Sequence, residues 1–180
     1  MAGNFIADTL RGRELNHYPQ LIQKGVRLHR FIDTYTDTHD IPLRTRRMLY
    51  PYFGKYAAVV QDVFYDHFLA ANWDAYHEMR LKEYTRFAYK TLQEAEEFFF
   101  FLAALTFHYM HIQDWLTGYA SDQGIDRALS GLSRRAKFES NMDRSLPVLR
   151  RYRSEIDKDF RQFFPELISA SKDFLSGESL

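Results

Sequence analysis

The sequence predicts an all-α protein that folds as one compact, multi-helix domain over residues 1–180. Apolar residues recur at intervals of three and four positions along most of the chain, which is the period of an amphipathic helix. Only 8 glycines and 5 prolines occur, and no run shows the two-residue alternation of a half-buried strand. A length of 180 residues also lies in the usual range of a single domain.

The periodicity predicts the helices in order along the chain. They lie near residues 19–37, 42–52, 56–71, 80–95, 96–117, 123–136 and 142–175. Pro19 and Pro42 suit first-turn positions, and Gly54 and Gly118 suit helix ends. Pro165 is expected to kink or split the last helix, because proline lacks the N–H that a helix interior requires.

Charge and cysteine content exclude several classes of function. Lysine plus arginine and aspartate plus glutamate number 24 each, so no overall field favours nucleic acid or membrane lipids. Because the chain contains no cysteine, it forms neither disulfides nor thiolate metal sites. The start lacks a secretory signal pattern, and the longest apolar block, residues 98–107, is about half of a membrane-spanning helix. We therefore expect a cytoplasmic protein that binds neither nucleic acid nor membranes.

In the helix predicted over 19–37, a histidine and a carboxylate occupy positions where the pattern calls for apolar groups. Steps of three and four residues place Ile22, Val26, His29 and Asp33 on one stripe about 60° wide. Asp37 lies one turn further on, about 40° from Asp33. The stripe borders the expected core side of the helix, which is marked by Leu21, Gly25, Leu28, Ile32 and Tyr35.

A second helix carries carboxylates in an apolar setting. The segment 57–69 is apolar nearly all round, which predicts a helix buried on most sides. Asp62 and Asp66 share one stripe of this helix, and His67 borders it. Like charges at this spacing destabilise a helix slightly, and a buried carboxylate is costly unless it is paired or bound to a cation. A divalent metal would relieve both problems.

Histidine with several aspartates, without cysteine, is the ligand set expected for manganese, magnesium or iron rather than for structural zinc. Such an ion lowers the pKa of bound water and polarises a phosphoryl oxygen, which suits phosphate ester hydrolysis. The plain alternatives are that His29 and Asp33 form a hydrogen-bonded core pair, and that Asp62 and Asp66 face water or an arginine. Two such helices in one small chain favour the metal site.

Several blocks of sequence resemble the acyl carrier protein phosphodiesterase family. They are Gly-Asn-Phe-Ile-Ala-Asp at 3–8, Tyr-Pro at 18–19, Gly-Val-Arg-Leu-His-Arg-Phe-Ile-Asp-Thr-Tyr-Thr-Asp at 25–37, Asp-Val-Phe-Tyr-Asp-His-Phe-Leu at 62–69 followed by Trp73, and Asp-Trp-Leu at 114–116. Their order and spacing fit the family, and the similarity spans nearly the whole chain. Together the blocks are much more specific than any one of them.

The resemblance implies a helical fold related to the HD-type metal phosphohydrolases. It implies hydrolysis of the phosphodiester that joins 4′-phosphopantetheine to a serine of acyl carrier protein, which converts the holo form into the apo form, with manganese as the expected metal. Carried over by motif, the expected metal ligands are Asp8, His29, Asp33, Asp62 and Asp66. The expected catalytic residues are Asp33, Asp66 and His67, with protonated His67 assisting departure of the serine oxygen.

The sequence departs from the family pattern at its start. Chains of this family usually carry a short Asn-Phe-Leu-Ala-His segment before the block at 3–8, whereas this sequence starts almost at that block. We expect either a start further upstream or a metal site with one histidine fewer. Two other functions therefore stay open, namely hydrolysis of another small phosphodiester or nucleotide, and binding of the carrier protein by a helical module without turnover.

An acidic partner such as acyl carrier protein requires a local basic surface on a chain whose net charge is zero. The first candidate is formed by Arg44, Arg46 and Arg47. Two further candidates are Arg134 with Arg135, and the group at Arg150, Arg151 and Arg153. The alternative is that these are ordinary solvated arginines on helix exteriors.

Overall fold

The structure is a computed structural model that describes residues 1–10 and 15–177. All regular secondary structure in these two ranges is helical, which confirms the all-α prediction for this part of the chain. The α-helices are α1 (Ala2–Ile6), α2 (Gln20–Thr38), α3 (Asp40–Phe53), α4 (Ala57–Ala71), α5 (Leu81–Gln93), α6 (Phe101–Ile112), α7 (Trp115–Gly118), α8 (Asp122–Arg135) and α9 (Ser145–Gly177). Short 3₁₀ segments are η1 (Ala7–Leu10), η2 (Leu15–His17), η3 (Gly54–Tyr56), η4 (Trp73–Ala75), η5 (Glu96–Phe98) and η6 (Met142–Arg144).

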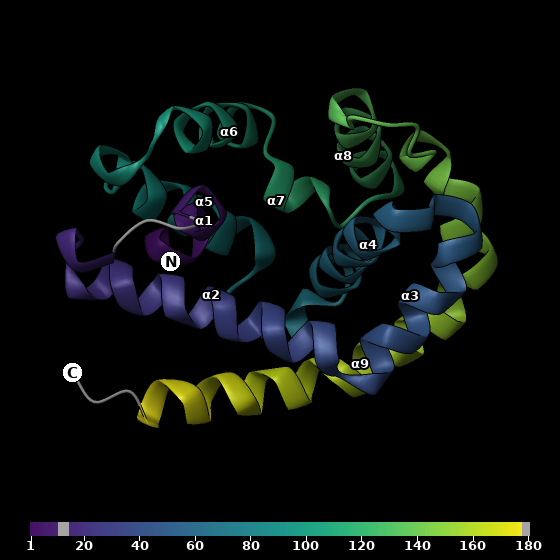
Figure 1. The fold of residues 1–180 in the computed structure, drawn as a ribbon, viewed down its shortest axis with the longest axis horizontal. Helices are drawn as coiled ribbons and strands as arrows, with labels where there is room; N and C mark the ends of the chain where they lie inside the picture. The colour runs from purple at the N-terminus through teal and green to yellow at the C-terminus, as the bar shows by residue number, and fades with distance from the viewer. Residues whose placement is uncertain (11–14, 178–180) are drawn as a thin grey trace.

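The long helix α9 curves along one side of the molecule and packs against α2, α3, α4 and α8 (Figure 1). Helix α4 lies in the middle of these elements, in contact with α3, α8 and α9. On the other side α1 packs against α2, with α5 and α6 above them in the view of Figure 1. None of the helices in the described ranges is both long and apolar enough to cross a bilayer.

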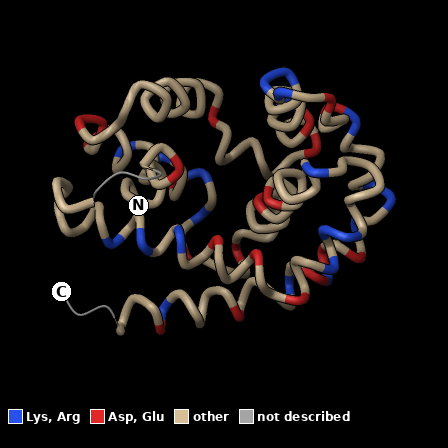
Figure 2. The backbone as a smooth tube through the Cα atoms, in the orientation of Figure 1, with Lys and Arg blue, Asp and Glu red and all other residues tan. Residues whose placement is uncertain are grey.

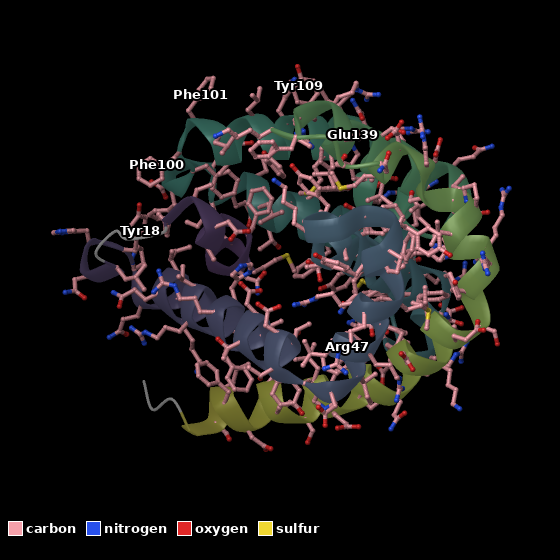
Figure 3. All side chains as sticks on the ribbon, turned by 45° about the vertical axis from the view of Figure 1, so that its right-hand side comes forward. Tyr18, Arg47, Phe100, Phe101, Tyr109 and Glu139 are labelled. Atoms are coloured by element: carbon pink, nitrogen blue, oxygen red, sulfur yellow. The ribbon has the colours of Figure 1, made fainter. Side chains whose placement is uncertain are left out.

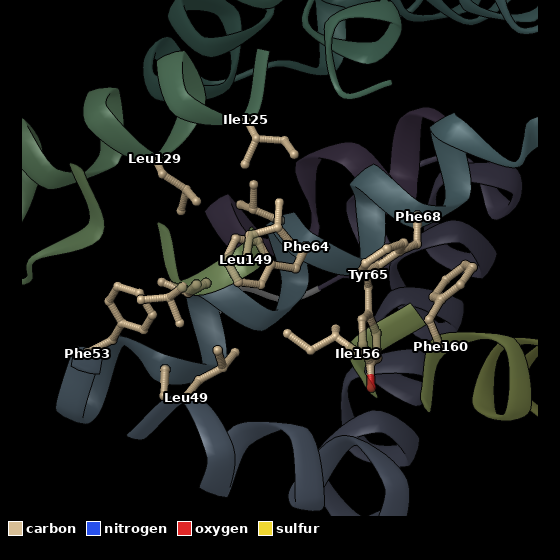
Figure 4. Close-up of a cluster of buried hydrophobic side chains, with 14 of the residues drawn as sticks. Leu49, Phe53, Phe64, Tyr65, Phe68, Ile125, Leu129, Leu149, Ile156 and Phe160 are labelled. Atoms are coloured by element: carbon tan, nitrogen blue, oxygen red, sulfur yellow. The ribbon is translucent and has the colours of Figure 1, made fainter. Parts of the chain in front are cut away.

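The buried apolar side chains form two clusters. The first joins α3, α4, α8 and α9, and Figure 4 shows Phe64 of α4 among its side chains. The second joins α1, α2, α5 and α6 around Ile6, Val26 and Phe107. Fully burying a side chain such as Phe64 stabilises the fold by about 1.5–3 kcal/mol. Helix α4 belongs to the first cluster, whereas α1 and the first half of α2 belong to the second.

Two glycines allow α1 and α2 to pack at backbone distance. A Cβ added at Gly3 would lie 2.1 Å from the carbonyl oxygen of Ile22, and one added at Gly25 would lie 2.9 Å from the backbone nitrogen of Asn4. Neither contact is possible for a larger residue without movement of a helix. The sequence did not predict α1 as a helix. Its close packing on α2 brings the start of the chain, including Asp8, beside the middle of α2.

This packing also changes the buried side of α2. Ile22 and Val26 are buried because α1 covers them, whereas Leu21 is 78% exposed. The expectation that Leu21 marks the core side is therefore wrong. The apolar period alone did not reveal that a short helix from the beginning of the chain would cover the neighbouring stripe.

Two further expectations about helices are wrong. The helix predicted over 96–117 is divided into η5, α6 and α7, because Phe99 and Phe100 are extended and Asp114 adopts left-handed φ of 46°. In α9 the non-helical residue is Tyr152, with φ −111° and ψ 16°, and not Pro165. Pro165 is exposed, so the carbonyl group that lacks its N–H partner can be hydrated while the helix continues.

Candidate metal centre

Three of the predicted metal ligands come together from two elements. Asp8 lies in η1, and His29 and Asp33 lie one turn apart on α2. The Nε2 atom of His29 is 3.2 Å from Oδ2 of Asp33 and 3.8 Å from Oδ1 of Asp8. One potential ligand atom from each residue lies within 4.8 Å of the others. This spacing is compatible with three side chains that share one cation.

The imidazole of His29 supplies a further observation. Its Nε2 atom is buried and makes no hydrogen bond, although the carboxylate of Asp33 is near. A buried polar atom without a partner is costly, and a neutral imidazole nitrogen is a good metal ligand. The donor set therefore fits a divalent cation, which would occupy the position between the nitrogen and the carboxylates.

The carboxylates of α4 lie within electrostatic range of this group. The pKa of Asp62 is raised to about 6, chiefly by burial and in part by the charges of Asp37, Asp33 and Asp8. Acidic positions of α2 and α4 are visible in the middle of the molecule in Figure 2. The helical spacing on α2 and α4 thus brings carboxylates of both helices within electrostatic range of one another, an arrangement that a cation would stabilise.

Asp66 extends this acidic group by one turn of α4. The pKa of Asp66 is raised to about 7, chiefly by burial and in part by the nearby charge of Asp62. The residues Asp62 and Asp66 are both exposed to water. Partial burial of their carboxyl groups by the surrounding protein is nevertheless the first cause of the rise in each pKa. The carboxylate of Asp66 lines a recess of about 350 Å³ formed by α4, α5, α7 and α9.

Arg46 partly compensates this negative charge. Its guanidinium donates a 2.8 Å hydrogen bond to Oδ1 of Asp37, and its positive charge opposes the rise in the pKa of Asp62. The alternative in which Asp62 faces an arginine is therefore present in part. Among the described residues Arg46 lies beside the carboxylates of Asp37 and Asp62, and this position is compatible with a cation held by Asp8, His29 and Asp33.

His67 points away from the carboxylates. Its Nδ1 atom is 2.8 Å from the carbonyl oxygen of Tyr119, and its Nε2 atom is 2.9 Å from a guanidinium nitrogen of Arg153. Because arginine only donates, Nε2 accepts and Nδ1–H donates to the carbonyl. Burial lowers the pKa of His67, so the ring is neutral. Both ring nitrogens are occupied, and this geometry gives no support to His67 as the proton donor.

The predicted partner-binding arginines have different surroundings. Arg44 forms an ion pair with the buried carboxylate of Asp159, which also accepts a 2.8 Å hydrogen bond from the hydroxyl of Thr45. Arg46 forms an ion pair with Asp37. Arg47 is exposed. Two of the three candidates therefore contribute to internal ion pairs, which no pattern in the sequence indicated because their partners lie on other helices.

Sequence reasoning did not single out Tyr119. This residue lies after α7, is held by His67 through its carbonyl group, and lines the recess that contains Asp66. Burial raises the pKa of its phenol, and the nearby carboxylate of Asp66 raises it as well. The only signal was its proximity to the motif at 114–116, which is too weak to identify one tyrosine among 12.

Comparison with known proteins gives a consistent result over nearly the whole chain. A family model described as acyl carrier protein phosphodiesterase matches residues 1–167. The acyl carrier protein phosphodiesterase of Photorhabdus laumondii is 28% identical over 185 residues, which cover 97% of this chain and 89% of that protein. The corresponding proteins of an Enterobacter species and of Klebsiella pneumoniae are 29% and 28% identical, each over 96% of this chain and 90% of the relative. No solved structure matches the chain.

Proposed function

Because the chain belongs to the acyl carrier protein phosphodiesterase family, we propose that it hydrolyses the phosphodiester between 4′-phosphopantetheine and a serine of holo acyl carrier protein. The products are the apo carrier protein and free 4′-phosphopantetheine. The observation that carries this proposal is the family match over residues 1–167, which contains every candidate site residue. The enzyme is thus a phosphoric diester hydrolase, and the carrier protein is its substrate.

We propose that the reaction depends on a divalent cation held by Asp8, His29 and Asp33, with Asp62 and Asp66 beside it. Manganese is the first expectation, and magnesium and iron are the alternatives. The unpartnered nitrogen of His29 and the concentration of carboxylates support this assignment. When bound, such an ion polarises the phosphoryl oxygen and lowers the pKa of water.

The other residues have supporting roles in this proposal. Arg46 adds positive charge beside Asp62 and Asp37, which favours approach of an anionic phosphodiester. His67 holds the backbone of Tyr119 and accepts from Arg153, so we assign it a positioning role. Proton donation by His67 stays a prediction, as do the relation to the HD-type phosphohydrolases, the single-domain organisation and the cytoplasmic location.

The test is an assay of the purified chain with holo acyl carrier protein and manganese, together with elemental analysis. We expect apo carrier protein and free 4′-phosphopantetheine by mass spectrometry, and loss of both after chelation because the carboxylates would no longer share a cation. Activity should return when manganese is added back.

Other outcomes separate the alternatives. Binding of the carrier protein without turnover under manganese, magnesium or iron would favour a non-catalytic module. Hydrolysis of nucleotides or of other small phosphodiesters, with the holo carrier left intact, would favour a different phosphohydrolase. Full activity in a metal-free sample would contradict the proposed cation.

A further inference from the structure

The recess beside Asp66 has the dimensions of a ligand site. Its volume of about 350 Å³ lies within the range of about 300–1,000 Å³ that is typical of small-molecule pockets. The walls come from four helices and the segment after α4, so residues far apart in sequence form one continuous surface. Asp66 lines the recess one turn of α4 beyond Asp62, and Asp62 is itself within electrostatic range of Asp8 and Asp33.

The chemistry of the walls favours an uncharged, partly apolar ligand. Among the described residues no lysine or arginine lines the recess, and Asp66 is the only carboxylate there. Leu81, Ile168 and Phe164 supply apolar surface. A described wall with one carboxyl group and no lysine or arginine does not favour an anionic chain along the length of the recess.

Three tyrosines add polar groups to these walls. Tyr76, Tyr84 and Tyr119 line the recess, and within residues 1–10 and 15–177 none of their hydroxyl groups has a hydrogen-bond partner. A phenol both donates and accepts, which suits amide groups in a ligand. A few polar groups on an otherwise apolar wall are the usual arrangement of a site that orients a small molecule.

We propose that this recess binds the pantetheine arm of the substrate, with the phosphodiester at the Asp66 end. This inference rests on the proposed function. The arm is an uncharged chain with two amides, a hydroxyl and a geminal dimethyl group, so the tyrosine hydroxyls match its amides and the aliphatic walls match its methyl groups. With the arm in this recess, the anionic phosphodiester would lie at Asp66, toward the carboxylates of the candidate metal centre. The proposed cation would neutralise its charge there.

A second hollow provides the contrast. It measures about 440 Å³ between α6, α7 and α8, and Arg127, Arg134 and Arg135 line it without any carboxylate. Its positive lining does not suit an uncharged arm, and none of the four acidic candidate residues is among its lining residues. Leu105 of α6 lines this hollow and offers a matched position for a control.

The test uses pantetheine itself, which lacks the phosphate and so reports on the recess independently of the metal. Replacing Leu81 or Ile168, both half-buried in the walls, by tryptophan fills the recess. We expect pantetheine to bind the full chain in a calorimetric titration, and Leu81→Trp and Ile168→Trp each to weaken it at least about tenfold because bulk replaces the ligand volume. Leu105→Trp should leave the dissociation constant unchanged.

The same variants should raise KM for holo carrier protein while bis(p-nitrophenyl) phosphate, a diester without the arm, is hydrolysed at the wild-type rate. The two variants lie on different helices, so the test can still be made if one of them misfolds. Circular dichroism shows whether each variant is folded. Any of three results would overturn the inference. They are unchanged pantetheine binding in both folded variants, no pantetheine binding to the wild type, and displacement of pantetheine by adenosine at equal concentration. Failure of the proposed function would show separately, as an intact holo carrier in the wild-type assay.

Discussion

At the scale of single residues, His29 and Asp33 show how a local pattern becomes a candidate site. Their spacing on α2 alone brings Nε2 to 3.2 Å from the carboxylate, and this follows from helix geometry. The same pair is compatible with a plain structural interaction. What separates the two explanations is the third side chain, Asp8, whose carboxylate approaches the same nitrogen from another element.

Replacing Asp33 with asparagine should remove activity and keep the fold. The side chain is 54% exposed, so the change costs little packing, whereas loss of a ligand should lower hydrolysis on the order of 100-fold or more. The measurements are holo-carrier turnover and manganese content. Asp173→Asn, on the exposed face of α9, is the matched control. Wild-type activity and metal content in Asp33→Asn would identify His29 and Asp33 as a structural pair.

At the scale of elements, the contact between α1 and α2 decides where Asp8 lies. The carbonyl of Ile22 occupies the position that a side chain at Gly3 would need. Because this obstacle is backbone, it cannot be relieved by rotation of a side chain. Geometry at the candidate metal centre therefore depends on a helix of five residues, which is too short to be stable alone.

Gly3→Ala should push α1 away from α2. We expect the free energy of unfolding in urea to fall by about 1–3 kcal/mol, as for other overpacked contacts, and activity to fall because Asp8 moves from His29. Gly131→Ala is the control, since the nearest atom to its added Cβ is a guanidinium nitrogen at 3.9 Å. That change should be neutral or stabilise α8 by about 0.5–1 kcal/mol. Equal effects of both substitutions would contradict this account.

At the scale of the whole molecule, a chain with zero net charge must offer local charge to an acidic carrier protein. Arg134 and Arg135 lie at the end of α8 and line one hollow together with Leu105 and Tyr109 of α6. Phe101 and Tyr109 project from α6 to the surface (Figure 3). Within residues 1–10 and 15–177 neither arginine forms an ion pair. By contrast, Arg44 and Arg46 have internal partners.

Reversing both charges, as Arg134→Glu with Arg135→Glu, should raise KM for holo carrier protein several-fold. The substitutions remove electrostatic attraction between the enzyme and the carrier protein. The increase in KM should therefore become smaller at high salt, because the Debye length is only about 10 Å at 0.1 M. Steady-state kinetics at low and high salt is the measurement, with bis(p-nitrophenyl) phosphate as a substrate that needs no docking. Arg47→Glu is the comparison variant. A larger effect at Arg47 would instead place the carrier on α3.

The helices themselves were largely predictable, because the apolar period reports which face of a segment is buried. The breaks were less so. Phe99, Phe100 and Asp114 interrupt the segment predicted as one helix, since the run is apolar enough to be helical and only packing decides where it turns. Pro165 shows the converse, because an exposed proline did not interrupt α9.

The candidate site divides in the same way. The sequence by itself determined which side chains share a helical stripe, His29 with Asp33 and Asp62 with Asp66, because these relations depend only on 3.6 residues per turn. Tertiary structure alone decided that Asp8 joins His29, and that His67 turns to Tyr119 and Arg153. The reason is physical: such contacts depend on how closely helices pack, and the spacing of residues along one chain does not encode the distance between two helices.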